Sequence, residues 1–135
     1  MQLSVSKFSS LADAVAAKKA EIDEAAGATR SKYITAVPGQ AETYLRKSDD
    51  AKAYIAAGSP SDSTSYPWVK ADAEAYGITP GEAAEAIMAQ EAAWRLLGTG
   101  IEIIRLGCKK QLDQATTTAQ VNRIATEAIQ KLEAV

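Results

Sequence analysis

Apolar residues recur every seven positions from Ile87 to Ala115, and this repeat constrains the fold more than any other feature of the sequence. Two further apolar residues, Leu97 and Ile104, fall on the same face. The members of the repeat are Ile87, Trp94, Ile101, Cys108 and Ala115. A seven-residue spacing keeps side chains on one side of an α-helix, whereas a half-buried strand needs alternation every second residue. The pattern therefore predicts a helical segment whose apolar face contacts other helices.

The repeat runs through a segment that contains three glycines, LLGTGIEIIRLG at Leu96–Gly107. A dinucleotide-binding fingerprint would need another glycine three residues after Gly100, and a phosphate loop would need Gly-Lys-Ser or Gly-Lys-Thr. Neither pattern is present. Two interpretations remain: a helix that breaks near Gly98, or a continuous helix in which Gly100 and Gly107 let another helix approach closely. Each glycine inside a helix costs roughly 1 kcal/mol relative to alanine, so tight packing or a bend must offset the cost.

The rest of the chain also favours helix. Alanine and the long polar residues dominate, and runs of β-branched residues are scarce. We predict an all-α fold of four to five helices, arranged as a helical bundle or as a helical hairpin with an extended N-terminal helix. Ser10 is expected to cap the first helix, whose stripe keeps helical spacing until Gly27 ends or loosens the helix. That stripe consists of Leu11, Val15, Ile22 and Ala26.

Proline, glycine and capping patterns predict where the later helices begin and end. Pro38 predicts either a kink or a new helix start, and one face of the helix that follows is formed by Tyr44, Leu45, Ala51 and Ile55. The sequence GSPSDSTS at 58–65 predicts a loop. Pro67 then opens a short helix that ends at Gly77, with Trp68, Val69 and Ala73 expected to pack inward.

Two capping boxes are expected, at Thr79 with Glu82 and at Thr117 with Gln120. Val121, Ile124, Ala125, Ala128 and Leu132 are expected on the inner face of a terminal helix. The predicted organisation is an N-terminal helical region at 1–57, the loop at 58–65 and a C-terminal helical bundle region at 66–135, all within one domain.

Charge and composition exclude several classes of function. The net charge is −2 and the isoelectric point is about 5.2, so a nucleic-acid partner is not expected. No apolar run reaches the length of a membrane span or resembles a signal peptide, which predicts a soluble protein made in a cytoplasm, with no membrane partner. Histidine is absent, which removes the side chain most often used for proton transfer near neutral pH and for binding transition metals.

The remaining candidates for chemistry favour structural roles. Cys108, the only cysteine, lies on the apolar stripe and has no histidine to activate it, so we expect a buried small hydrophobe. Asp49 and Asp50 are adjacent and point in different directions on a helix, which favours a solvated face over a cation site. We therefore expect no enzyme, and no catalytic, cofactor-binding or metal-binding residue.

The order of features in the chain resembles that of a known group of proteins. It begins with VPGQAETYLRKSDDAKAYIAAG and continues with YPWVKADAEAYGITPGEAAEAIMAQEAAWRLLGTGIEIIRLGCKKQLDQATT. A Pro-x-Gln segment before a Tyr-rich helix, a short Pro-Trp helix, a helix with a central Trp and a basic stretch before an Ala-Thr-rich end resemble small helical tail and tail-fibre-associated proteins of tailed bacteriophages. The resemblance covers about Tyr33 to Val135. It supplies no catalytic residues.

The resemblance implies a non-enzymatic structural or assembly protein of a phage tail or tail fibre, either a virion component or a fibre-assembly chaperone. Such a protein would bind other tail or fibre chains in the host cytoplasm and, if retained, would be part of the virion tail. The narrow first stripe and the seven-residue repeat also predict a homo- or hetero-oligomer. The candidate helix-contact positions are Leu11, Val15, Ile22, Ile87, Trp94, Gly100, Ile101, Ile104 and Gly107.

Two alternatives remain open at this point. The first is a phage-encoded inhibitor or regulator that binds a host protein, and the second is an enzyme that uses carboxylates alone. The position of the gene beside a fibre gene or among early genes would separate the assembly role from the inhibitor role.

Overall fold

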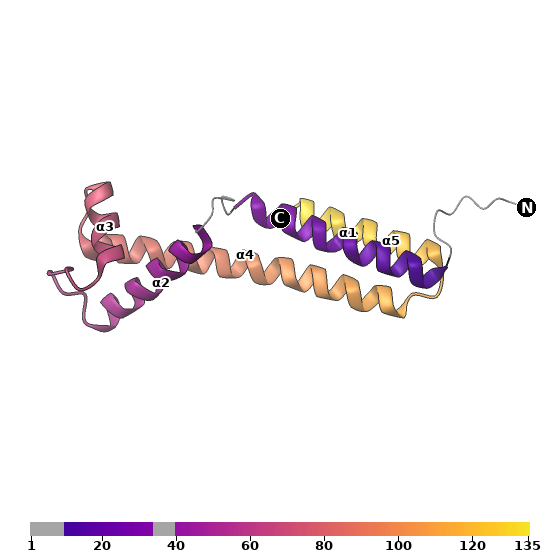
Figure 1. Cartoon of the computed structure of the whole chain (residues 1–135), viewed down its shortest axis with the longest axis horizontal. Helices are drawn as coiled ribbons and strands as arrows, with labels where there is room; N and C mark the ends of the chain where they lie inside the picture. Colours follow the sequence, from indigo (N-terminus) through magenta and orange to yellow (C-terminus); the bar gives the residue numbers. More distant parts are fainter. Residues whose placement is uncertain (1–9, 34–39) are drawn as a thin grey trace, which may run out of the picture. The chain divides into compact units, whose positions relative to one another are not determined.

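The computed structural model describes residues 10–33 and 40–135, and within these ranges it contains five α-helices and no strand. Figure 1 shows them along the chain. The helices are α1 (Leu11–Ser31), α2 (Gln40–Ala56), α3 (Pro67–Tyr76), α4 (Pro80–Gln114) and α5 (Thr118–Glu133). The predicted all-α class is confirmed. Pro38, where we predicted a kink or a helix start, lies outside the described residues.

The described helices form two compact units, and α4 contributes to both. The first unit combines residues up to Tyr33 with 97–135, and the second ends at Leu96. This grouping differs from the predicted ranges 1–57 and 66–135. The reason is that α1 packs against α5 and shares one apolar cluster with α5 and the C-terminal part of α4, although α1 is far from both in the sequence. The loop predicted at 58–65 does lie between α2 and α3.

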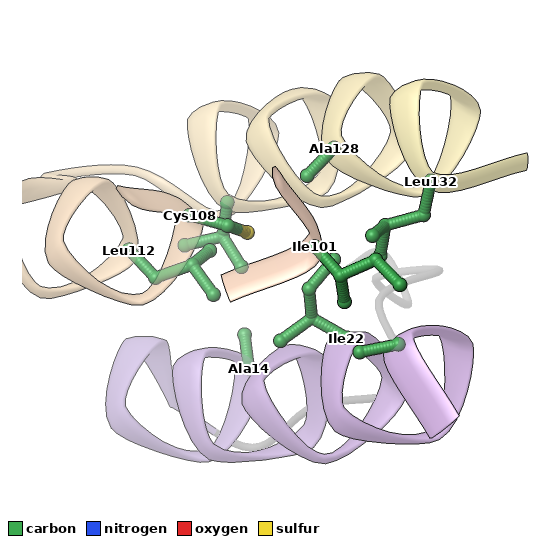
Figure 2. Close-up of a cluster of buried hydrophobic side chains, with 9 residues drawn as sticks. Ala14, Ile22, Ile101, Cys108, Leu112, Ala128 and Leu132 are labelled. Atoms are coloured by element: carbon green, nitrogen blue, oxygen red, sulfur yellow. The ribbon is translucent and has the colours of Figure 1, made fainter. Parts of the chain in front are cut away.

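The first unit is a bundle of α1, the C-terminal part of α4, and α5. Figure 2 shows Ala14 and Ile22 of α1 facing Ile101, Cys108 and Leu112 of α4 and Ala128 and Leu132 of α5. All of these side chains are buried. The Ala-rich stripe of α1 thus packs against α4 and α5 within the chain: Ile22 and Ala26 are buried, and Leu11 and Val15 are partly buried.

Ion pairs fix the direction of α1 relative to α4. Lys19 Nζ lies 2.6 Å from Asp113 Oδ1, and Lys109 Nζ lies 2.9 Å from Asp23 Oδ1. Near the other end of α1, Arg30 pairs with Glu102. Because residue numbers rise along α1 while those of its partners fall along α4, the two helices run antiparallel.

Hydrogen bonds from the end of α1 show that α1 and α5 run parallel. The Thr29 hydroxyl lies 3.2 Å from the Leu132 carbonyl oxygen, and the Tyr33 hydroxyl donates to the Val135 carbonyl over 2.9 Å. Carbonyls in the last turn of a helix have no partner within the helix. The end of α1 therefore supplies side-chain donors to carbonyls at and just after the end of α5, and the Leu132 carbonyl also accepts from the Val135 N–H.

The second unit packs α2 and α3 against the N-terminal part of α4. Its core consists of Ala51, Tyr54, Val69, Ala73, Ala83 and Ala84. The Tyr54 hydroxyl donates to the Pro60 carbonyl over 2.7 Å, which ties the loop to the core. The predicted inner face of α2 was wrong in part, because Leu45 and Ile55 are exposed whereas Ser48 and Tyr54 are buried. Trp68 is only half-buried, whereas Val69 and Ala73 belong to the core as expected.

The predicted capping residues bond helix N–H groups, but only one of the two predicted capping boxes closes. The Ser10 hydroxyl accepts from the Asp13 N–H, and Thr79 and Glu82 exchange both bonds of a capping box, at 3.0 and 3.1 Å. Gly77 adopts φ 66° as the left-handed cap of α3. At the start of α5, Thr117 accepts from the Gln120 N–H, but the Gln120 side chain bonds Thr116 instead of closing the box.

Two predicted glycine breaks are absent. Helix α1 continues through Gly27 to Ser31, and α4 is one 35-residue helix that includes Gly98, Gly100 and Gly107. The interpretation in which a helix breaks near Gly98 is therefore wrong. Despite the length of α4, no helix in the described part of the chain combines the length and the apolar character needed to cross a bilayer.

Candidate functional site

The groups most often used in catalysis give no site among the described residues. Within residues 10–33 and 40–135, no three cysteine, aspartate or glutamate side chains are placed to hold a metal ion together. Cys108 is only 4% exposed, and burial raises the pKa of its thiol. A thiol with a raised pKa holds less of the reactive thiolate near neutral pH, so the predicted core role of Cys108 agrees with its position.

Asp49 and Asp50 differ in their surroundings, and only Asp49 is exposed as expected. Asp50 Oδ2 accepts hydrogen bonds from the backbone N–H groups of Trp68 at 2.8 Å and Val69 at 2.9 Å. These are first-turn N–H groups of α3, which have no partner within the helix. Tyr66, at the N-cap position of α3, makes no side-chain cap bond. Asp50 on α2 therefore caps α3, and the prediction that both carboxylates only face solvent was wrong for this residue.

Five of the predicted helix-contact residues lie in the first unit, against or within its core. Ile22 and Ile101 are fully buried, and the partly buried Leu11, Val15 and Ile104 pack against the same cluster. Their partners are residues of α1, α4 and α5 within this chain. These positions therefore contribute to the core of the first unit.

Ile87 and Trp94, on the same sequence repeat, lie in the second unit. Ile87 is partly buried against the core of that unit. Trp94 packs edge-to-face against Tyr44 of α2, with ring centroids 4.0 Å apart. The seven-residue repeat thus continues along one helix but serves two separate apolar clusters.

Gly100 and Gly107 do not make the close helix contact that we expected within the chain. A Cβ atom added at either position would meet no atom within 4 Å. Each glycine comes one residue before a buried position, Ile101 or Cys108, and one residue is about 100° of rotation around a helix. The two glycines therefore lie beside the buried face of α4, where Gly100 is partly exposed and Gly107 is exposed.

The same outer side of α4 carries large apolar side chains that we did not single out from the sequence. Ile103 is 73% exposed and Leu106 is 53% exposed. Their positions relative to Gly100 and Gly107 follow the three- and four-residue spacing that places side chains on one face of a helix. We call these four residues, Gly100, Ile103, Leu106 and Gly107, the outer face of α4. Ile103, Leu106 and Gly107 are exposed, Gly100 is partly exposed, and none of the four residues is charged.

A cleft of about 530 Å³ opens between the helices of the second unit. Ile78 and Ile87 supply aliphatic side chains to its lining. One wall is aromatic, formed by the packed rings of Tyr44 and Trp94, and Tyr76, which is largely exposed, also lines the cleft. A cleft of this size with an apolar lining has the dimensions of a ligand-binding site.

The lining of the cleft also includes charged residues, but their charges are paired. Lys47 Nζ lies 2.9 Å from Asp72 Oδ1, and both side chains are mostly buried. Glu91 pairs with Arg95. In addition, none of the buried side-chain nitrogen and oxygen atoms in the described ranges lacks a hydrogen-bond partner. The cleft therefore presents polar groups without an unpaired charge that would require a charged ligand.

No protein-family model matches the chain, and no curated protein or solved structure matches it either. We therefore infer function from the two surfaces described above, the outer face of α4 and the cleft, together with the order of features along the sequence. Each surface lies within a described helix or a single unit.

Proposed function

We propose that this chain is a non-enzymatic assembly protein of tailed bacteriophages that binds a tail or tail-fibre protein through the outer face of α4. The observation that carries the proposal is the combination, on that face, of two exposed large apolar residues with two helical glycines at which an added Cβ atom would meet no atom within 4 Å. The partner would lay a helix or a fibre segment along α4, and the two chains would form a hetero-oligomer.

The glycines favour a partner because they destabilise α4, and no close contact within the chain offsets this loss of stability. Each one weakens α4 by roughly 1 kcal/mol relative to alanine, and no neighbouring atom uses the space that the missing Cβ atoms leave. Glycine also permits close approach of another backbone. A partner helix packed against Gly100 and Gly107 would use that space and would cover Ile103 and Leu106.

The exposed apolar residues provide the energy for such a contact. Burying one large aliphatic side chain contributes about 1.5–3 kcal/mol, and an amphipathic helix that docks in this way is held by anchors spaced three, four and seven residues apart. Ile103 and Gly107 lie three and seven residues after Gly100, and Leu106 lies three residues after Ile103. The resemblance to tail-associated proteins supports a tail or fibre chain as the partner.

Substitutions on the outer face test this proposal. Ile103→Gln removes an anchor, and Gly100→Leu fills the space that close approach requires. Ile103→Gln should keep the helical content and unfolding midpoint of the parent, because Ile103 is exposed. Gly100→Leu should keep the helical content and stabilise the chain by up to about 1 kcal/mol, because it removes a glycine from the interior of α4. Leu45→Gln is the matched control, since Leu45 is 63% exposed but lies on α2.

The readout is recovery of the tagged chain with the fibre protein, and in purified particles, from cells that produce the phage. We expect both outer-face variants to reduce recovery at least tenfold, whereas the Leu45 control retains it. Recovery that is unchanged in Ile103→Gln and Gly100→Leu would overturn the proposed docking face. Recovery of a host protein alone, lost in the same variants, would support the inhibitor alternative instead.

A further inference from the structure

We propose that the cleft of the second unit receives an uncharged aromatic side chain, presented on a peptide segment of the partner protein. Aromatic anchors that fill pockets contribute much of the energy of protein interfaces. The proposal rests on the proposed function for the source of the segment, but the binding itself is tested without that partner.

The walls of the cleft favour an aromatic occupant. The rings of Tyr44 and Trp94 pack edge-to-face, and an inserted ring could join them in the offset or edge-to-face arrangements that aromatic side chains prefer. Ile78 and Ile87 add apolar side chains to the lining, which the ring can contact. Tyr76 adds a third aromatic side chain to the lining, and it is 73% exposed in the free protein.

The charges favour a neutral occupant. Lys47 and Asp72 satisfy each other within the cleft, and Glu91 is already paired with Arg95. A charged ligand would have to lose its hydration without gaining an unpaired opposite charge, and that exchange is costly. An aromatic residue without charge meets no such penalty.

Amide side chains favour a peptide over an isolated ring. Gln40 and Gln90 both line the cleft, and each primary amide can donate and accept hydrogen bonds. A peptide group beside the inserted ring also has one donor and one acceptor. The cleft therefore matches an aromatic residue together with its flanking peptide bonds.

The first test is titration of the full chain with N-acetyl-tryptophanamide, followed by nuclear magnetic resonance. We expect the Trp94 indole N–H resonance to shift with a dissociation constant on the order of a millimolar, as suits a ligand of this size. Trp68 does not line the cleft, so its indole resonance is an internal control and should stay in place. No shift at Trp94, or equal shifts at both indoles, would overturn the proposal.

Three further probes test the chemistry of the occupant. N-acetyl-leucinamide and N-acetyl-argininamide carry the same peptide groups with an aliphatic or a cationic side chain, and each should bind at least fivefold more weakly. Indole carries the ring without the peptide groups and should also bind more weakly. Tighter binding of the arginine probe would overturn the preference for a neutral group, and equal binding of indole would overturn the peptide part of the proposal.

Ala86→Phe fills the cleft, because Ala86 lines it from an exposed position on α4. We expect this variant to lose at least tenfold in affinity for N-acetyl-tryptophanamide. Ala89→Phe, at an exposed position of the same helix outside the cleft lining, is the matched control and should bind like the parent. Equal affinity in the two variants would contradict binding in the cleft.

Trp94→Leu provides a second test that does not depend on the filled variant. It removes one aromatic wall, so it should weaken the tryptophan probe more than the leucine probe. Equal weakening of both probes would contradict aromatic recognition. These titrations report on the cleft alone, whereas recovery with the fibre protein reports on the outer face of α4, so the failure of one proposal can be distinguished from the failure of the other.

Discussion

At the scale of single residues, the least expected role is that of Asp50. Its carboxylate lies on α2 but accepts two N–H groups from the first turn of α3. Capping is usually a local event, in which a side chain bonds an N–H group two or three residues later. Here the cap comes from eighteen and nineteen residues away, and it joins two helices at the same time.

Replacement of Asp50 by alanine should therefore destabilise the protein by about 1 kcal/mol, within the roughly 0.5–2 kcal/mol range of cap removals. The physical reason is that two N–H groups of α3 lose a charged acceptor. The measurement is the midpoint of urea unfolding, followed by far-ultraviolet circular dichroism.

Asp49→Ala is the control for the Asp50 substitution, because the adjacent Asp49 is exposed. Its effect should stay within about 0.5 kcal/mol, as is usual for surface substitutions. Equal midpoints for the two variants would show that Asp50 contributes no more than an ordinary surface carboxylate.

At the scale of helices, charge pairs specify how α1 lies against α4. Asp23 accepts hydrogen bonds from Lys109 at 2.9 Å and from Arg105 at 3.0 Å, and Arg105 also bonds Glu102. These bonds hold the pKa values of Asp23 and Glu102 below their ordinary range. A shift of α1 by one helical turn would separate these paired charges, so they favour the observed alignment of the two helices.

The lowered pKa of Asp23 predicts how stability depends on pH. The hydrogen bonds from Lys109, and then those from Arg105, favour the carboxylate in the folded state. Its contribution is therefore fully present above the ordinary pKa of 3.8 and is lost as the pH falls through the lower folded value. Asp23→Asn should cost up to about 1 kcal/mol at pH 7, because the pair is partly exposed to solvent. This difference should shrink below about pH 4.

Urea unfolding at several pH values, with parent and variant side by side, measures this dependence. Glu24→Gln changes the neighbouring exposed carboxylate and should give a much smaller difference across the range. A cost of Asp23→Asn that stayed constant from pH 7 to pH 2 would rule out the charge-dependent bonds as its cause.

At the scale of the whole molecule, two separate apolar cores are built on one continuous helix. The core of the first unit and that of the second share no residue, although both draw on α4. Local opening of a protein follows cooperative units with their own packed contacts. Each core is therefore expected to determine how strongly the backbone amides of its own helices are protected against hydrogen exchange.

Hydrogen exchange on two core variants tests this independence. Ile22→Ala should reduce stability by about 2–5 kcal/mol and should lower amide protection mainly in α1, α5 and residues 97–114. Val69→Ala should lower protection mainly in α2, α3 and residues 80–96. Loss of protection spread evenly over both units in either variant would show that the two cores open together.

Local features were the most predictable from the sequence. The capping box at Thr79 and Glu82 and the left-handed Gly77 depend on residues close in the chain, and both were found where expected. The core positions Ile22 and Ile101 also followed from helical spacing. In contrast, Leu45 matched the expected spacing on α2 but is exposed, because spacing cannot say which side of a helix another helix will cover.

The candidate sites were less predictable for the same reason. Around Gly100, apolar residues occur on more than one side of α4, so the sequence offers both Ile101 and Ile103 as inner positions. The cleft is built by three helices, and its aromatic wall joins Tyr44 to Trp94 across fifty residues of chain. No local pattern encodes such a pairing.

The formation of helices and the residues at which they begin and end thus follow from local chemistry. Alanine and long polar side chains favour helix, and capping residues bond terminal N–H groups only a few positions away. The choice of buried face followed from tertiary packing. Helices α1 and α5 cover Ile101 and Cys108 and leave Ile103 in solvent, because apolar burial is non-directional and depends on which surfaces other segments of the chain supply.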